Sequence, residues 1–156
     1  MALFNPHELR ASLAPNARLL GLDPGSRTIG LALSDVSLML ASPFATVKRD
    51  KLGKVADALA KIVRAQDVGG IVTGLPLSLD GSFGPAARAA QDWTEALSDR
   101  LGVPACAWDE RLSSSAVNRF LISDMDMTRK RRAEVVDKMA AAYTLQSYLD
   151  ATRETI

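Results

Sequence analysis

Residues 18–34 have the sequence RLLGLDPGSRTIGLALS. The run 18–22 is apolar and ends at Asp23-Pro24-Gly25-Ser26, a group of residues typical of a tight turn. A second apolar run, 28–33, follows almost at once. The stretch therefore predicts two buried strands that pair as an antiparallel hairpin, with a carboxylate at the turn between them.

The segments after this hairpin alternate between strand and helix patterns. A third strand at 43–47 would lie at a sheet edge, because proline is tolerated at the start of an edge strand. Further strands are predicted at 70–73 and 103–108, and helices at 52–65, 85–101, 112–122 and 129–149. This order indicates an α/β fold with a mixed five-stranded sheet flanked by helices. The right-handed crossover rule makes the first, fourth and fifth strands parallel.

Residues 1–17 precede the first strand, and we interpret them as an N-terminal extension. Asn5-Pro6 followed by Glu8 matches the start of a helix, which would be short and end near Ala14-Pro15. We assign this extension no function. Residues 18–156 would then form one domain, in keeping with a total length of 156 residues.

The composition excludes several classes of protein and site. The chain has one cysteine, Cys106, and one histidine, His7, which excludes a disulfide framework, a thiolate zinc cage and a histidine-rich metal site. No run approaches the roughly 20 apolar residues of a membrane span, and no signal peptide is recognised. We therefore expect a cytoplasmic protein that does not enter the membrane. With 19 Lys+Arg against 18 Asp+Glu, any nucleic-acid-binding surface must come from local clustering of charge.

Acidic residues follow two of the predicted parallel strands. Asp23 comes directly after the first strand, and Asp109 and Glu110 come directly after the last. Because the carboxyl ends of parallel strands meet at one edge of a sheet, these acids should share that edge, where ligands bind in such folds. Only one of the two adjacent acids can face the same side as Asp23, since side chains alternate along a strand.

A third acid, Asp137, lies in the predicted helix at 129–149. Ala140 and Ala141 follow it at spacings of three and four residues, so this face of the helix can approach the sheet closely and bring Asp137 toward the same edge. Taken singly, each acid is more simply explained as a turn residue or a helix cap. Three carboxylates that converge without histidine or cysteine partners favour a hard cation, Mg²⁺ or Mn²⁺. A pair of such ions can support phosphodiester hydrolysis.

Basic and polar residues lie next to these acids in the sequence. The one dense basic run, residues 129–132, precedes Asp137 in the sequence. It is either an ordinary solvated face or a surface that holds a phosphate backbone. The loop at 74–84 is longer than most connections, which favours a functional contact over a simple link. The candidate nucleic-acid-binding residues are Ser26, Arg27, Ser78, Arg111, Arg129, Lys130, Arg131, Arg132 and Lys138.

Four segments together resemble a known family. They are LDPGSRTIG at 22–30, VTGLPLSLDGS at 72–82, DERLSS at 109–114 and VDKMAA at 136–141. In this order and spacing they resemble the YqgF family, also called RuvX-like proteins, a branch of the RNase H-like nucleases. The resemblance covers residues 18–150, nearly the whole chain. The second and third segments together are specific to the family, whereas either alone is not.

The resemblance implies an RNase H-like fold and a bacterial, cytoplasmic nuclease that uses divalent metal ions. It implies metal ligation by Asp23, Asp137 and an acid of the DER segment, with Glu110 favoured and Asp109 as the alternate. Two positions depart from the family pattern: Ser78 replaces a common Asn, and Lys138 replaces a common Ser. Lys138 is positioned in the sequence to pair with Asp137 or to contact a phosphate.

Three functions are compatible with these observations. The family is assigned to maturation of the 5′ end of 16S ribosomal RNA, which makes precursor rRNA the first expected partner. The older family assignment is Holliday junction resolvase, which would act on four-way DNA and require a homodimer with two sites. The third is a catalytically weak nucleic-acid-binding module, which a folded protein that binds no metal at Asp23 would favour.

Overall fold

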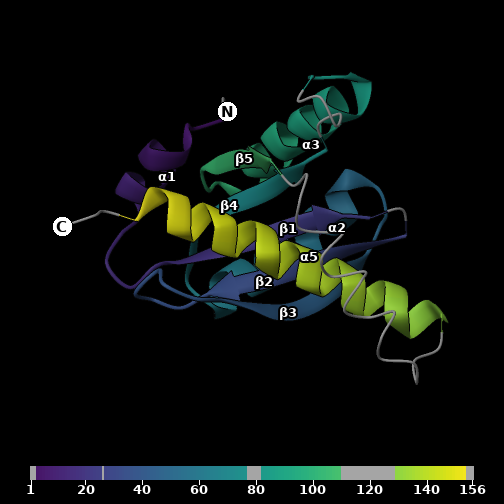
Figure 1. The fold of residues 1–156 in the computed structure, drawn as a ribbon, viewed down its shortest axis with the longest axis horizontal. Coiled ribbons are helices and arrows are strands. Elements are labelled where there is room, and N and C mark those ends of the chain that lie inside the picture. The colour runs from purple at the N-terminus through teal and green to yellow at the C-terminus, as the bar shows by residue number, and fades with distance from the viewer. Residues whose placement is uncertain (1–2, 26, 77–81, 110–128, 154–156) are drawn as a thin grey trace.

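The computed structural model describes residues 3–25, 27–76, 82–109 and 129–153. Over these ranges the chain forms a five-stranded sheet with helices on both faces (Figure 1). The elements are α1 (Pro6–Ser12), β1 (Arg18–Pro24), β2 (Thr28–Ser34), β3 (Ala41–Lys48), α2 (Leu52–Ala65), β4 (Val68–Leu75), α3 (Pro85–Leu101), β5 (Ala105–Asp109) and α5 (Arg129–Thr152). The helix predicted at 112–122 lies outside the described residues.

The strand order in the sheet is β3-β2-β1-β4-β5. β1 and β2 pair antiparallel, as do β2 and β3, whereas β4 pairs parallel to both β1 and β5. The predicted hairpin and the parallel first, fourth and fifth strands are therefore confirmed. β1, β3, β4 and β5 run in the same direction, so their carboxyl ends meet at one edge of the sheet, which we call the carboxyl edge.

The central and edge strands differ in burial as their sequences predict. In β1 the four residues from Leu19 to Leu22 are all buried, because helices cover both faces of this strand. β3 lies at the edge, where Ser42, Pro43 and Phe44 are exposed. A proline is tolerated there because the outer side of an edge strand has no neighbour to receive its backbone hydrogen bond.

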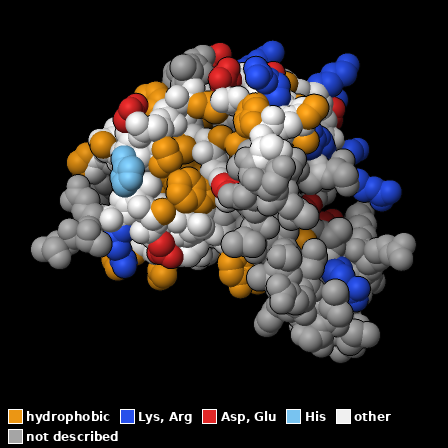
Figure 2. All heavy atoms as spheres, turned by 45° about the horizontal axis from the view of Figure 1, so that its top comes forward, with side chains coloured by type: hydrophobic (Ala, Val, Ile, Leu, Met, Phe, Trp, Pro, Cys, Tyr) orange, Lys and Arg blue, Asp and Glu red, His pale blue; other side chains and the backbone are white. Residues whose placement is uncertain are grey.

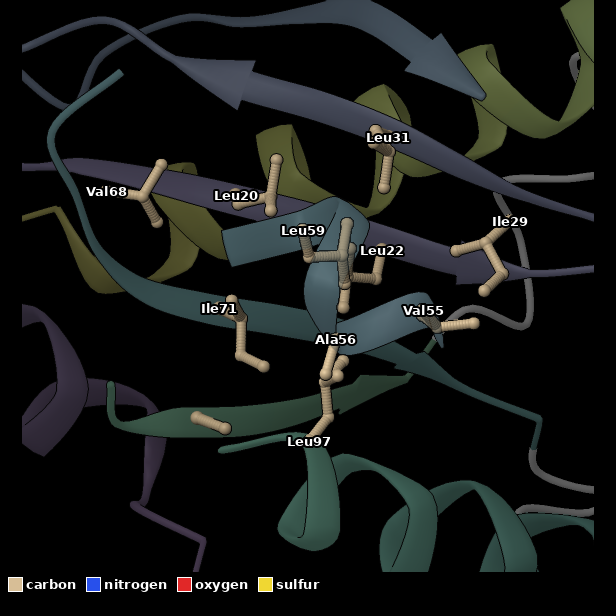
Figure 3. Close-up of a cluster of buried hydrophobic side chains, with 11 residues drawn as sticks. Leu20, Leu22, Ile29, Leu31, Val55, Ala56, Leu59, Val68, Ile71 and Leu97 are labelled. Carbon is tan, nitrogen blue, oxygen red and sulfur yellow. The ribbon is translucent and has the colours of Figure 1, made fainter. Parts of the chain in front are cut away.

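The hydrophobic core has two layers, one on each face of the sheet. Leu20 and Leu22 point to the first layer, where they meet α2 and α3 through Leu59 and Leu97 (Figure 3). Alternate residues such as Leu19 point to the opposite layer. That second layer is completed by α5, which runs across the other face of the sheet, and by α1 (Figure 1). The sheet is thus enclosed between helices on its two faces.

The N-terminal helix is part of the second core layer. The Asn5 side chain accepts a hydrogen bond from the Glu8 backbone N–H and so caps α1, as the sequence predicts. Leu9 is fully buried in this layer. The Arg10 guanidinium donates hydrogen bonds to the Leu149 carbonyl at 3.0 Å and to the Thr152 hydroxyl at 3.1 Å. α1 therefore holds the C-terminal end of α5, a structural role that the sequence does not reveal.

None of the helices in the described ranges has the length and apolar composition that crossing a membrane requires.

Candidate functional site

The predicted acids on the strands lie at the carboxyl edge, within the strands themselves. Asp23 is the penultimate residue of β1 and pairs with Gly30 of β2. Asp109 is the last residue of β5 and pairs with Leu75 of β4. Both strands are one or two residues longer at this end than the sequence pattern predicts. β4 lies between β1 and β5, so the two acids are separated by two strand spacings, about 10 Å.

Side-chain alternation places Asp23 on the face that α5 covers. Leu19 packs into the α5 layer, and Gly21 lies directly under α5, since a Cβ there would be 3.1 Å from the Ala141 carbonyl oxygen. Asp23 follows these residues at steps of two and therefore shares their face. The close approach of α5 at Ala141 is the one that the small residues of this helix predict.

The same alternation places Asp109 on the other face. Cys106 packs into the α5 layer, whereas Ala105 packs against α2 and α3. Trp108 stacks edge-on against Tyr148 of α5, which confirms that the even positions of β5 face this helix. Asp109 follows Ala105 by four residues and shares its face. Asp23 and Asp109 thus lie at the same edge but on opposite faces of the sheet.

Asp137 of α5 lies against the β1–β2 turn. An added Cβ at Gly30 would be 1.9 Å from the Asp137 carbonyl oxygen, so the absence of a side chain at Gly30 allows the helix backbone to touch β2. The Asp137 carboxylate reaches the turn itself, where a Cβ at Gly25 would be 2.9 Å from its Oδ2 atom. Since Asp23 pairs with Gly30, Asp23 and Asp137 flank the same turn from β1 and α5.

The Asp137 carboxylate is half-buried and held by one hydroxyl. Burial raises the pKa of Asp137 above its ordinary value. The Thr28 hydroxyl donates a hydrogen bond to Asp137 Oδ2, which lowers the pKa and opposes that shift, while the charge of Glu134 raises it further. Thr28 therefore fixes the position of the carboxylate, and burial disfavours its negative charge. A bound cation would neutralise that charge.

Two acids on one turn leave a metal site incomplete within the described part of the chain. Over those ranges there is no group of three or more His, Cys, Asp or Glu side chains that could hold a metal ion. Asp23 and Asp137 are both oxygen donors, and the Gly25 backbone leaves space beside both oxygens of the Asp137 carboxylate. These features fit a hard divalent cation, to which a further acid would have to contribute.

Basic side chains gather at the same edge. Arg27 is exposed in the β1–β2 turn, and Lys48 and Arg49 are exposed where β3 ends. The Arg49 guanidinium donates a hydrogen bond of 2.7 Å to the Gly25 carbonyl, so it is fixed to the turn that carries the acids. On the face shown in Figure 2, Lys and Arg side chains lie mainly toward the upper right. The carboxyl edge thus has the positive charge that a phosphate backbone requires.

The remaining predicted contact residues are only partly described. Arg131 is exposed and Arg132 half-buried in the first turns of α5, and Lys138 is half-buried beside Asp137. No ion pair joins Lys138 to Asp137 among the described residues. The predicted residues whose side chains lie outside the described part of the chain are Ser26, Ser78, Glu110, Arg111, Arg129 and Lys130.

Three residues near the acids are not predicted by the sequence patterns used above. Glu134 precedes Asp137 by three residues, a spacing that places both on one helix face and is a usable signal. Thr28 contacts Asp137 only because β2 and α5 meet across 109 residues of sequence, for which no local pattern exists. Arg49 is likewise brought to the turn by the β2–β3 pairing.

Comparisons with known proteins agree on the class of molecule. The family model RuvX, described as Holliday junction resolvase, matches residues 17–151. A Gluconobacter oxydans protein named "Putative pre-16S rRNA nuclease" is 74% identical over 98% of this chain and 96% of its own. A Gluconacetobacter diazotrophicus protein of the same name is 64% identical over 99% of this chain and 100% of its own. The Thermus thermophilus RuvC structure in complex with Holliday junction substrate has a TM-score of 0.52 at 15% identity, covering 86% of this chain and 94% of its own. That structure is similar in fold.

Proposed function

The chain belongs to the RuvX family of RNase H-like nucleases, and we propose that it hydrolyses phosphodiester bonds with divalent metal ions to process the 5′ end of precursor 16S rRNA. The observation that carries the proposal is that Asp23 and Asp137 lie at the same turn of the carboxyl edge. Gly25 and Gly30 have no side chains, which leaves room for the Asp137 carboxylate at the turn and for its backbone against β2.

Asp23, Asp137 and Glu110 would hold the metal ions. Asp109 faces the α2–α3 side of the sheet, opposite to Asp23, so of the two adjacent candidates Glu110 is the better third ligand. The ions, Mg²⁺ or Mn²⁺, would stabilise charge on the attacking and leaving oxygens. The protein's own part is to fix two carboxylates on rigid elements, and Thr28 orients one of them.

Basic side chains at the carboxyl edge would hold the substrate strand. Arg27 lies on the turn between the acids, and Lys138 follows Asp137 directly. In this proposal Arg131, Arg132 and Lys138 contact phosphates from α5, on the same side as the acids. The other proposed contacts are Ser26, Ser78, Arg111, Arg129 and Lys130.

The choice of precursor rRNA rests on the names of the relatives, two of which exceed 60% identity over nearly their whole lengths. A second candidate is resolution of four-way DNA junctions, because the family description names that activity. A resolvase would have to present two sites to two strands and hence act as a homodimer. The two functions use the same acids, and the substrate distinguishes them.

Cleavage of two substrates in one assay tests this proposal. Wild type and Asp23→Asn would be incubated with Mg²⁺ or Mn²⁺, an RNA carrying the 16S 5′ leader, and a four-way DNA junction. Asn keeps the shape of Asp and loses its charge, so we expect at least about a 100-fold loss of cleavage with an unchanged circular dichroism spectrum. Asp57→Asn, at an exposed position of α2, is the matched control and should cleave like wild type.

The outcomes separate the candidate functions. Asp23-dependent trimming of the RNA supports the rRNA nuclease, and paired symmetric nicks in the junction support the resolvase. Full activity of a folded Asp23→Asn protein, or activity that survives removal of metal by a chelator, contradicts the assignment of the site. Cleavage of neither substrate by folded protein favours a binding module.

A further inference from the structure

A hollow opens on the opposite side of the β1–β2 turn from Asp137. Its lining includes Pro24, Arg49 and Pro76 from the carboxyl edge and Ala89, Ala90 and Trp93 from α3, and its volume is about 270 Å³. Pro24 directly follows Asp23 in β1 and points to the other face of the sheet. One strand end thus carries a candidate metal ligand on one face and a wall of this hollow on the other.

We propose that this hollow receives the base of a nucleotide next to the phosphate bound at Asp23 and Asp137. The proposal rests on the proposed nuclease function and adds to it a subsite for single-stranded substrate. A strand whose phosphate lies at the acids can pass around the β1–β2 turn, and the hollow lies on the other side of that turn, with Pro24 of β1 in its wall.

The chemistry of the walls fits a nucleobase. Prolines, alanines and the half-buried Trp93 offer apolar surface to the flat faces of a base, and an aromatic side chain can stack on any base without regard to sequence. Arg49 is the one charged side chain among the described lining residues and can donate to carbonyl or ring-nitrogen acceptors at a base edge. The volume is slightly below the roughly 300 Å³ at which sites for drug-sized ligands begin, which suits one base.

Small residues of α3 keep the hollow open. Ala86, Ala89, Ala90 and Trp93 follow one another at helical spacing, and the first two are exposed. Arg49 is tied to the turn by its 2.7 Å hydrogen bond to the Gly25 carbonyl, so a base held by Arg49 has a fixed position relative to Asp23 and Asp137. Exposed Lys48 precedes Arg49, and exposed Lys51 follows it after Asp50, so this segment carries positive charge for the connecting phosphates.

Binding in the presence of a chelator tests the subsite without requiring catalysis. The probes are a labelled hexauridylate and a fully abasic ribose-phosphate strand of the same length and charge. We expect the base-bearing strand to bind about fivefold or more tightly. Ala89→Leu fills the hollow and should remove this difference while leaving the affinity for the abasic strand unchanged. Ala151→Leu makes the same change at an exposed position of α5 and should retain the difference.

Trp93 provides a direct reporter. The chain has two tryptophans, so Trp108→Phe leaves Trp93 as the only one. In this variant uridine 5′-monophosphate should quench the fluorescence, and ribose 5-phosphate should not. Equal binding of both strands by wild type, or a base preference that persists in folded Ala89→Leu, would overturn the subsite. Neither result bears on Asp23-dependent cleavage, so failure of the subsite and failure of the nuclease proposal are distinguishable.

Discussion

Gly30 shows how one missing side chain positions a candidate ligand. A Cβ at this residue would lie 1.9 Å from the Asp137 carbonyl oxygen and 2.8 Å from the Lys138 nitrogen, both backbone atoms that cannot move alone. We expect Gly30→Ala to push α5 off β2 and to lower the free energy of unfolding by about 3 kcal/mol, the upper end of the usual range for overpacking. Urea denaturation measures this change.

Gly53→Ala is the control for that substitution. Its Cβ would meet only the flexible end of the Arg100 side chain, at 3.2 Å. Alanine in place of glycine in a helix adds roughly 0.5–1 kcal/mol to the free energy of unfolding where its side chain fits. Gly53→Ala should therefore be neutral or stabilising. Equal urea midpoints for the Gly30 and Gly53 variants would contradict the tight contact between β2 and α5.

Thr28 is a positioning residue, since its hydroxyl holds the Asp137 carboxylate. Thr28→Val keeps the shape and removes the donor, and we expect a loss of about 10- to 100-fold in metal-dependent cleavage, the usual range for a residue that orients a ligand. Thr28→Ser keeps the donor and should restore most of the activity. Steady-state cleavage rates at saturating metal provide the measurement, and equal rates for the Val and Ser variants would rule out this role.

Cys106 is a core residue. Burial raises the pKa of its thiol to about 12. At neutral pH the group is therefore almost wholly the unreactive thiol, because a thiol is deprotonated only as the pH approaches its pKa. We expect iodoacetamide to leave the native protein unmodified at pH 8 over hours and to label it fully in denaturant, as mass spectrometry would detect. Rapid labelling of the native protein would contradict the burial of this strand.

Among the elements, α1 joins parts of the chain that are far apart in sequence. Leu9 is fully buried, and Arg10 donates hydrogen bonds to the Leu149 carbonyl and the Thr152 hydroxyl of α5, so α1 holds the helix that carries Asp137. We expect Leu9→Ala to cost about 2–5 kcal/mol of stability. His7→Ala, at an exposed position of the same helix, should cost almost nothing. Thermal unfolding compares the two, and equal melting temperatures would mean that α1 does not support the core.

The elements also show what the sequence could and could not predict. Strands and helices with clear apolar periodicity, such as α2 and β2, are predicted within one residue of their bounds. The face of Asp109 is not predictable, because both faces of β5 are apolar, as Ala105 and Cys106 show, and the sequence does not tell which of them meets α5. The role of α1 is hidden for another reason: its partners, Leu149 and Thr152, lie some 140 residues away.

For the whole molecule, the distribution of charge matters more than its sum. The net charge is only +1, yet Arg27, Lys48 and Arg49 are exposed at the carboxyl edge, and Arg131 precedes Asp137 on α5. The antiparallel pairing of β3 with β2 brings the end of β3 to this edge, which is why basic residues some 25 positions from Asp23 lie beside it. The fold thus gathers basic side chains of a nearly neutral chain at the edge that carries Asp23, Asp109 and Asp137.

The salt dependence of binding tests this arrangement. Replacing Arg129, Lys130, Arg131 and Arg132 by Gln should weaken the binding of single-stranded RNA at low salt. It should also flatten the plot of log K against log salt by about 0.7 for each phosphate that the variant no longer neutralises.

Lys61→Gln with Arg64→Gln is the control, because these exposed residues end α2 at the opposite edge of the sheet. Fluorescence anisotropy of labelled RNA, measured at salt concentrations from about 50 to 200 mM, gives the slope for each variant, because affinity for nucleic acid falls steeply over this range. If the quadruple variant keeps the wild-type slope, the basic run is an ordinary solvated face, and the phosphates are held by the turn and β3 instead.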